Sequence, residues 1–343
     1  MGKVSVESVP YCYLCGAHGQ MLYTNLKDAL YNTPGIWSYR YCPNCGLIWL
    51  DPRPVPAEIG KFYENYSTHY INEFVPKLSS LRRIVQDAVL AAHLGYEDIV
   101  CGPTRKLLGK ILSLIPPIRE RVELNVRYLS GRSEGMLLDV GCGSGGWLAK
   151  MQSLGWKVVG VEPDEQAVKI AREKFGLKVY QGTLKEQKLA DNTFDAVTIS
   201  HVIEHVYDPV AFLEECSRIL KPKGYLVIFT PNIKSLGHRY FKRFWRGLEP
   251  PRHLYLFSFS TLKTCCERVG FKIRTLRSAV RYARGIWTTS KLIQMHDNCS
   301  INLSKKHRRF LNFEGIIFQL LEYGLRIFKR DIGEEIVLIA FKE

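Results

Sequence analysis

From residue 136 to the C-terminus, short apolar and β-branched runs alternate with segments of helical periodicity. This alternation is typical of a parallel sheet whose strands are connected by crossover helices. We therefore predict an α/β fold, with a mostly parallel seven-stranded sheet and helices on both of its faces. The predicted strands span residues 136–141, 157–162, 177–182, 194–200, 224–231, 271–279 and 334–342.

The sequence pattern divides the 343 residues into three parts. Their 46% hydrophobic content can supply a sizeable core. Residues 1–60 place Gly, Pro and Asn between short aromatic-rich runs, which predicts a small module of strands and tight turns. Residues 61–130 carry apolar positions at helical spacing and are predicted to form a helical linker or cap. Residues 131–343 are the predicted α/β domain, with a basic, mostly helical insertion at about 285–330.

Two C-x-x-C-G motifs lie in the N-terminal module, at residues 12–16 and 42–46. Each motif offers two thiolates from one tight turn, and the glycine lets the backbone curl so that amides can bond to the sulfurs. Four sulfurs complete a tetrahedral site with no position left for water, so a Zn²⁺ ion bound there would be structural. The predicted ligands of this zinc-ribbon-like module are Cys12, Cys15, Cys42 and Cys45. The alternative is a set of unmetallated cysteines.

The first strand of the α/β part runs into a glycine-rich turn at residues 139–146. Glycines permit the sharp turn and let a ligand approach the backbone closely. The spacing also satisfies the G-x-G-x-x-G pattern of dinucleotide-binding proteins, and Glu162 at the next strand end could hold a ribose diol in either case. Asp139 beside the turn favours a cationic ligand over an anionic pyrophosphate.

Over residues 136–275, five motifs in order resemble those of the class I S-adenosylmethionine-dependent methyltransferases, which have a Rossmann-like fold. The motifs are L-D-V-G-C-G-S-G (138–145), G-V-E-P-D (160–164), Q-G-T-L (181–184), S-H-V-I-E-H-V (200–206) and L-K-P-K-G (220–224). One position departs from the pattern, because Thr183 stands where family members often have an acidic residue that contacts adenine.

The resemblance implies S-adenosylmethionine as the cofactor and a role for each residue in its motifs. The backbone of the glycine turn would border the methionine moiety, Asp139 would orient its amino group, and Glu162 would accept the ribose hydroxyls. The strand exit, Ser200 or His201, would lie near the reactive methyl group. The cofactor residues implied in this way are Asp139, Gly141, Cys142, Gly143, Glu162, Pro163, Thr183, Leu184, Ser200 and His201.

Methyl transfer to a hydroxyl or carbon acid needs a base, and His201, His205 and His253 are the candidates. His253 is favoured, because its segment should lie on the carboxyl side of the sheet; His201 is the second candidate catalytic residue. The segment around His253 is similar to the His-Leu-x-x-Phe-Ser stretch of methyltransferases that act on sugars and small molecules. Some sugar C-methyltransferases also have an N-terminal zinc module, although they carry an acidic residue where Arg252 stands here.

The resemblance therefore favours a sugar, nucleotide sugar or lipid-linked glycan as the methyl acceptor. An RNA methyltransferase that grips RNA with its zinc module and basic surface is the first alternative. It is less favoured because no Asn-Pro-Pro-Tyr type motif follows the fourth strand. The second alternative is a noncatalytic interaction protein with a retained cofactor domain.

The net charge of +15 is concentrated at residues 239–330, which hold 20 Lys and Arg against 5 Asp and Glu. Such a surface is suited to an anionic partner, and Arg243, Arg246 and Arg252 could bind a phosphate of the acceptor. In the insertion, basic residues accompany an apolar stripe at helical spacing, which predicts either a helix lying on an anionic membrane or one packed against the domain. The stripe comprises Ile316, Ile317, Leu320, Leu321, Ile327 and Phe328.

We expect the protein in the cytoplasm, either free or at the inner membrane surface. No N-terminal stretch has the features of a cleavable leader, and no apolar run approaches the ~20 residues that cross a bilayer.

Overall fold

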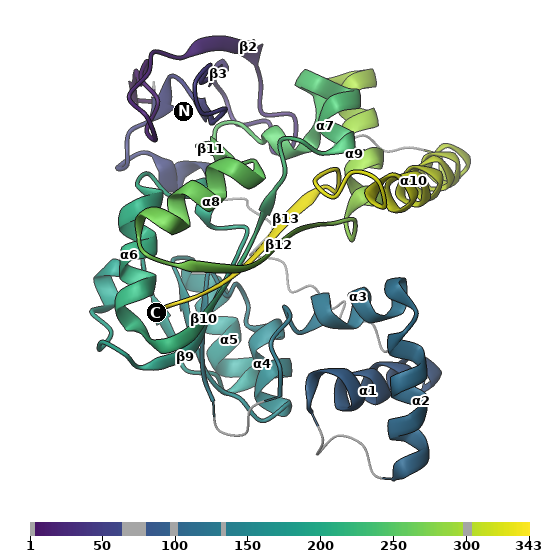
Figure 1. Ribbon diagram of the computed structural model, residues 1–343. Helices are drawn as coiled ribbons and strands as arrows, with labels where there is room; N and C mark the ends of the chain where they lie inside the picture. The colour runs from purple at the N-terminus through teal and green to yellow at the C-terminus, as the bar shows by residue number, and fades with distance from the viewer. Residues whose placement is uncertain (1–3, 64–79, 97–101, 132–134, 298–303) are drawn as a thin grey trace.

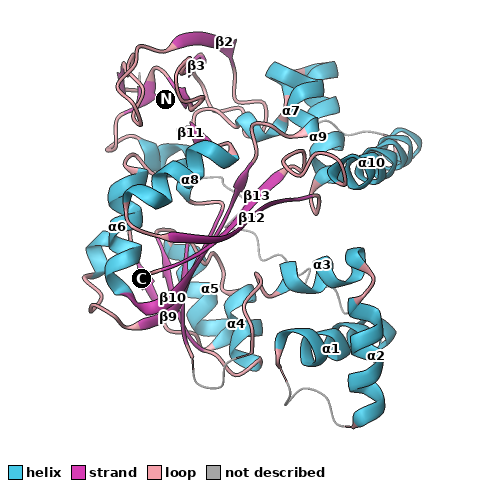
Figure 2. Cartoon of the chain, in the orientation of Figure 1, coloured by secondary structure: helices cyan, strands magenta, loops and turns pink. Residues whose placement is uncertain are grey.

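A computed structural model describes residues 4–63, 80–96, 102–131, 135–297 and 304–343 (Figure 1). A small β-rich part made by the N-terminal strands lies at the top of Figure 1, and a large twisted sheet occupies the centre. The helices that precede this sheet in the sequence lie at the lower right, as the cyan ribbons of Figure 2 show.

Seven strands form the central sheet: β6 (Met136–Val140), β7 (Lys157–Glu162), β8 (Val179–Gln181), β9 (Phe194–Ser200), β10 (Leu220–Pro231), β12 (Lys272–Ala279) and β13 (Glu335–Phe341). Their order is β12-β13-β10-β9-β6-β7-β8. The strands from β10 to β8 pair in parallel, and β13 runs antiparallel to both β10 and β12. The predicted mostly parallel, seven-stranded Rossmann-like sheet is confirmed. Strand β10 begins before the predicted residue 224, because Leu220 already pairs with Phe194.

Helices cover both faces of the central sheet. The first face packs against α4 (Gly146–Ser153) and α5 (Glu165–Phe175), and the second against α6 (Pro209–Ile219) and α8 (Phe259–Arg268). Successive strand residues point to opposite faces, so Leu137 joins the core under α4 while Leu138 joins the core under α6. Burial on both faces explains why these strands are nearly continuous apolar runs in the sequence.

The N-terminal strands form two small sheets. Strands β1 (Val6–Glu7) and β5 (Arg53–Pro54) pair with each other, and the second sheet contains β2 (Gln20–Leu26), β3 (Trp37–Tyr41), β4 (Ile48–Leu50) and β11 (Tyr255–Leu256). Strand β11 comes from the α/β part of the chain and pairs with β4. The core of this part is continuous with the core under α6 and α8. The small sheet is therefore completed by residues beyond the predicted boundary at residue 60.

The remaining helices lie before the central sheet and between its last strands. They are α1 (Ser80–Leu94), α2 (Pro103–Ser113), α3 (Pro116–Asn125), α7 (Leu236–Phe241), α9 (Ala283–His296) and α10 (Lys305–Arg326). Parts of the predicted linker, residues 64–79 and 97–101, and residues 298–303 of the predicted insertion lie outside the described residues. None of the helices in the described ranges is long and apolar enough to cross a membrane.

Candidate active site

The predicted cofactor residues lie where the parallel strands end. Asp139 is in β6, and Glu162 is the last residue of the neighbouring strand β7. Strand β9 lies on the other side of β6, so the sheet grows in opposite directions from this point, and open α/β sheets bind ligands at such a position. At the turn after β6, Gly141 has φ +71°, and a Cβ there would lie 2.4 Å from Cγ2 of Val202. Only glycine fits this position.

Gly143 connects the glycine turn to Glu162. Its amide donates to Oε2 of Glu162 at 2.8 Å, and the amide of Asp164 donates to Oε1 at 3.1 Å. Burial raises the pKa of the Glu162 carboxyl, while these two amides act in the opposite direction. A Cβ on Gly143 would meet no atom within 4 Å, so the space over the turn is open. The result is a fixed carboxylate beside a backbone that a ligand can approach.

Asp139 is fully buried and is held by an arginine that the sequence analysis missed. Nη1 of Arg127 donates to Oδ1 of Asp139 and, at 2.9 Å, to Oγ1 of Thr198. The Thr198 hydroxyl donates in turn to Oδ1 of Asp139 at 2.7 Å. The Arg127 guanidinium also lies 3.7 Å from the ring centroid of Trp147. No motif marks Arg127, because it reaches the site from the segment after α3.

This arrangement fits S-adenosylmethionine. Oδ2 of Asp139 is buried without a hydrogen-bond partner among the described residues, so an ammonium group would supply the missing donor. Each oxygen of Glu162 accepts one amide and keeps a lone pair for a ribose hydroxyl. Arg127 could hold the carboxylate of the methionine moiety. Two buried carboxylates against one arginine favour a ligand with cationic groups, as the sequence suggested.

Five other predicted cofactor residues lie at or just after the carboxyl ends of strands β6 to β9: Cys142, Pro163, Thr183, Leu184 and Ser200. The amide of Thr183 donates to Oε2 of Glu186 at 2.6 Å. Leu184 is buried in the hydrophobic core, so its backbone rather than its side chain would border a ligand. The contacts of these residues with the cofactor stay predictions.

His201 lies between two buried carboxylates rather than in a position to accept a proton. Its Nε2 is 2.8 Å from Glu335, and its Nδ1 is 3.3 Å from Glu204. Burial lowers the pKa of His201, but the two carboxylates outweigh burial and raise it to about 9. An imidazole that is protonated at neutral pH does not act as a base, so the geometry argues against His201 in that role.

His253 has the geometry expected of a base. Its Nδ1 donates to the carbonyl of Gly247 at 2.8 Å, which leaves Nε2 with the lone pair. Burial lowers the pKa of His253 to about 4, against the opposing charge of Glu249. The ring centroids of His253 and His205 are 4.8 Å apart, and Nδ1 of His205 is 2.9 Å from the hydroxyl of Tyr63. The described structure therefore joins a neutral imidazole with a second histidine and a tyrosine.

Glu204, His205 and His253 bring one carboxylate oxygen and two ring nitrogens within 4.8 Å of one another. This ligand set could hold a divalent transition metal. Oε2 of Glu204 already accepts from Thr230 at 2.9 Å, however, and Oε1 lies 3.3 Å from Nδ1 of His201. Burial raises the pKa of Glu204, but His201 and the other histidines lower it to about 2. Its ion pair with His201 is the role that the geometry supports.

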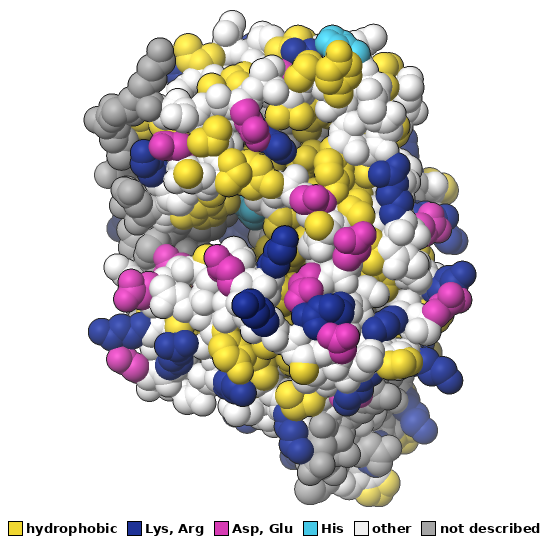
Figure 3. Space-filling view, turned by 90° about the vertical axis from the view of Figure 1, so that its left-hand side faces the viewer, with side chains coloured by type: hydrophobic (Ala, Val, Ile, Leu, Met, Phe, Trp, Pro, Cys, Tyr) yellow, Lys and Arg dark blue, Asp and Glu magenta, His cyan; other side chains and the backbone are white. Residues whose placement is uncertain are grey.

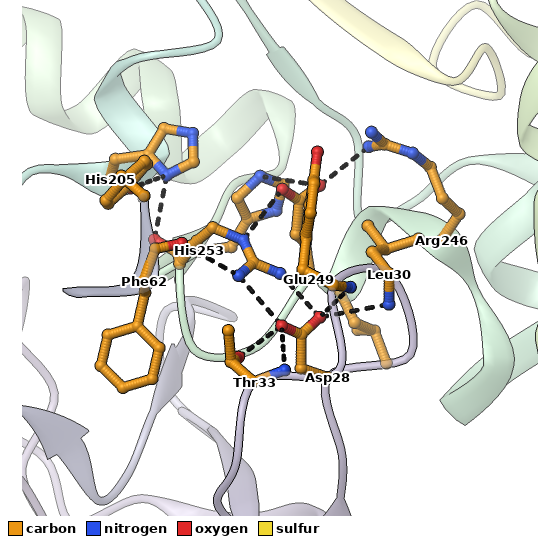
Figure 4. Close-up of polar contacts among 12 residues, drawn as sticks. Asp28, Leu30, Thr33, Phe62, His205, Arg246, Glu249 and His253 are labelled. Atoms are coloured by element: carbon orange, nitrogen blue, oxygen red, sulfur yellow. Dashed lines mark hydrogen bonds and ion pairs between the residues drawn. The ribbon is translucent and has the colours of Figure 1, made fainter. Parts of the chain in front are cut away.

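Arg252 does not face an acceptor, which corrects the prediction that it could bind a phosphate. It is fully buried, its Nη2 donates to Oδ1 of Asp28 at 2.7 Å, and its Nη1 donates to Oδ2 at 3.0 Å. Its Nε donates to Glu249 at 3.3 Å. Figure 4 shows Asp28, Glu249, His205 and His253 converging on one place from both parts of the chain. Arg252 therefore ties the N-terminal part to the loop that carries His253.

The other two arginines of that prediction are also partnered. Nη1 of Arg246 pairs with Oε2 of Glu249 at 3.0 Å. Arg243 donates to the carbonyl oxygens of Thr24 and Asn25 at 3.1 and 3.3 Å. Arg243 therefore contacts the N-terminal part, and Arg246 pairs within the loop that carries His253. Figure 3 shows that the face on the left-hand side of Figure 1 is hollowed and that histidine atoms are visible inside the hollow.

The four predicted zinc ligands lie together in the N-terminal part. Their sulfur atoms are within 4.8 Å of one another, with 3.5 Å between Cys12 and Cys45 and 3.3 Å between Cys15 and Cys42. These separations are far longer than the ~2.05 Å of a disulfide. They are close to the ~3.8 Å between sulfurs that each lie about 2.3 Å from one tetrahedral zinc. The four thiols therefore fit one ion.

Residues 117–276 match a family model described as a methyltransferase domain. The Bradyrhizobium diazoefficiens protein named ubiquinone biosynthesis O-methyltransferase is 36% identical over 116 residues, which is 33% of this chain and 46% of that protein. The Caulobacter vibrioides protein of the same name is 34% identical over 145 residues, covering 36% of this chain and 58% of that protein. The chain thus spans about half the length of these relatives. A methyltransferase structure from Archaeoglobus fulgidus superimposes with a TM-score of 0.43 and 22% identity, over 66% of this chain and 93% of that one.

Proposed function

We propose an S-adenosylmethionine-dependent O-methyl transfer for this chain, whose residues 117–276 match a family model described as a methyltransferase domain. The observation that supports the proposal is the convergence of two sites at the carboxyl edge of one sheet. Asp139 and Glu162 form a cofactor site at the ends of β6 and β7, and the His253 loop lies against Glu204, which follows β9. The amide of Leu254 donates to the carbonyl of Glu204 at 2.8 Å. An acceptor bound between the two sites would lie close to the cofactor that Asp139 and Glu162 would hold.

S-adenosylmethionine supplies a methyl carbon bonded to a sulfonium, so an acceptor oxygen forms the new C–O bond as the C–S bond breaks and S-adenosylhomocysteine leaves. The residues of the chain must align the oxygen and take its proton. Nε2 of His253 accepts this proton, because Nδ1 is committed to Gly247 and the imidazole is neutral. Glu249, 3.9 Å from Nε2, stabilises the imidazolium that forms.

The acceptor in this proposal carries a hydroxyl group and binds between the N-terminal part and the methyltransferase domain. Support comes from contacts of the N-terminal part around His253. Tyr63 contacts His205, and Phe62 and Asp28 accept hydrogen bonds from Arg252. The relatives named O-methyltransferases favour oxygen as the acceptor atom. The sugar or glycan acceptor stays a prediction from the sequence, and RNA stays its alternative.

Transfer of a labelled methyl group to nucleotide sugars, phenols or RNA, compared in parallel, tests the three classes of acceptor. Transfer to none of them would contradict the proposal.

Replacement of Glu162 by glutamine is expected to weaken S-adenosylmethionine binding by about tenfold to 100-fold. An amide keeps one acceptor oxygen but loses the charge, and hydrogen bonds to a charged group are worth about 1.5–3 kcal/mol. Isothermal titration calorimetry with the cofactor measures the change. Glu165→Gln, on the exposed surface of α5, is the matched control. Equal affinities for Glu162→Gln and the unaltered protein would place the ribose elsewhere.

We further propose that Cys12, Cys15, Cys42 and Cys45 bind one structural Zn²⁺. Two equivalent turns support this, since Gly16 donates to the carbonyl of Cys12 at 2.9 Å and Gly46 to that of Cys42 at 3.0 Å. Elemental analysis of the purified protein is expected to give one zinc per chain, and Cys42→Ser is expected to lose the metal. Cys142→Ser, outside the cluster, should keep it. A metal-free native protein would refute the assignment.

A further inference from the structure

Helix α10 is apolar on two faces, and the described part of the chain covers one of them. The covered face carries Leu311, Gly315, Phe318 and Glu322. It packs closely on α9, because a Cβ on Gly315 would lie 2.9 Å from the carbonyl of Arg284 and the rings of Phe318 and Trp287 are 4.9 Å apart. The predicted packing against the domain therefore uses other residues than the predicted stripe. This packing does not explain the apolar side chains on the other face of α10.

The second face of α10 points large apolar side chains outward. Phe313 is 60% exposed and Leu320 is 65% exposed. Side chains three or four positions apart lie on one side of a helix, so the exposed residues form a continuous stripe. Between Phe310 and Leu321 the stripe extends about 16 Å along the helix axis. Its members are Phe310, Phe313, Ile317, Leu320, Leu321 and, beyond the helix end, Phe328.

Helix α2, together with the two residues that follow it, carries a second set of exposed apolar side chains. The exposed residues are Leu107, Leu108, Ile111, Leu114 and Ile115. Helices α2 and α10 both lie along the right-hand side of Figure 1, and α3 lies between them. Arg326 at the end of α10 forms an ion pair with Glu120 of α3. We call the stripes of α2 and α10 together the apolar face.

Basic side chains flank both stripes along the sequence, and the two acidic side chains of α10 are either hydrogen-bonded or buried. The exposed or half-buried basic residues are Arg105, Lys106 and Lys110 of α2, and Lys305, Lys306, Arg308, Arg309, Lys329 and Arg330 at the two ends of α10. Helix α2 has no Asp or Glu. In α10, Glu314 accepts from Nε1 of Trp287 at 3.3 Å, and Glu322 is buried.

We propose that the apolar face docks this protein on the surface of an anionic lipid bilayer, with the two stripes in the acyl boundary and the basic residues at the headgroups. Helices with an exposed apolar face and flanking Lys and Arg lie in the membrane interface in this way. A second copy of the chain fits less well, because both ends of α10 are basic and any symmetric pairing brings like charges together. RNA would leave the Phe, Leu and Ile side chains without partners.

Sedimentation of the full chain with vesicles tests the proposal. Vesicles of equal parts phosphatidylglycerol and phosphatidylcholine are expected to bind the protein, and vesicles of phosphatidylcholine alone to bind it far less. Phe313→Ser with Leu320→Ser is expected to lower the partition coefficient at least tenfold, because two exposed apolar side chains no longer enter the bilayer. Lys305→Glu with Arg309→Glu is expected to lower it about fivefold or more for each residue changed.

Two control variants match these changes outside the apolar face. Ile36→Ser replaces another exposed apolar side chain, and Lys169→Glu reverses a charge on α5; both should bind like the unaltered protein. Equal binding by the Phe313→Ser, Leu320→Ser protein would overturn the proposal. Absence of vesicle binding, together with a dimer in sedimentation equilibrium that this double variant dissociates, would overturn it in favour of self-association.

Discussion

Replacement of His253 by alanine is expected to lower kcat for methyl transfer by about 100-fold to 10,000-fold, the usual contribution of a general base. Nε2 of this imidazole is the nitrogen that keeps its lone pair, since Nδ1 donates to Gly247. Steady-state assays with labelled cofactor measure the effect. The affinity for S-adenosylmethionine, measured separately, should change little, because His253 lies outside the Asp139 and Glu162 site. His18→Ala, an exposed histidine of the N-terminal part, is the control.

The pH dependence of kcat provides an independent test of His253. Burial lowers the pKa of this imidazole to about 4, so it is neutral and able to accept a proton throughout the neutral range. The rate should therefore stay level as the pH falls from about 8 to 5 and decline only as His253 gains a proton near pH 4. Two results would exclude His253 as the base. One is an unaltered kcat in the alanine variant, and the other is a fall in kcat near pH 6.5, the ordinary histidine pKa of about 6.5.

Replacement of Asp28 by alanine is expected to lower the free energy of unfolding by about 3–5 kcal/mol, because it leaves the charge of Arg252 buried without its main partner. Both side chains are 0% exposed, and Asp28 also accepts from the amides of Leu30 and Tyr31 at 3.1 Å. Urea unfolding measures the change. Activity should fall as well, since Arg252 adjoins His253.

The matched control for Asp28 is Asp191→Ala. It removes the 66% exposed partner of Arg218 in a surface ion pair, which is expected to cost only about 0–1 kcal/mol. Asp28→Ala with Arg252→Met should recover part of the loss, because both charges of the buried pair are then gone. A cost for Asp28→Ala as small as that of the control would show that the two parts of the chain are not joined through this pair.

The cofactor end of the candidate site was largely predictable from the sequence, because local patterns encode it. A strand, a glycine turn and an acid at the next strand end are each defined within a few residues, and the parallel order places Asp139 and Glu162 side by side. Arg127 could not be found in this way. It approaches Asp139 from the segment after α3, and no spacing rule connects that segment with β6.

The acceptor end was predictable only as a set of candidates. The sequence offered three histidines as candidate bases, with His253 favoured and His201 second. The charges around them separate these two: Glu204 and Glu335 hold His201 protonated, while His253 is buried and neutral. Arg252 looked available for a phosphate because its partner, Asp28, lies 224 positions away in the sequence. The pairing of a buried charge depends on long-range packing, which residue type alone does not reveal.

The sequence by itself determined the succession of strands and helices along the chain, the glycine turn, the acid that faces this turn and the two cysteine turns. Each of these follows from hydrogen bonding and periodicity over a few neighbouring residues. The tertiary structure alone decided that β11 completes the N-terminal sheet, that Arg252 joins Asp28, and that large apolar side chains on one face of α10 are exposed. These features depend on which surfaces meet when the chain folds, and that choice is made by burial and charge across its whole length.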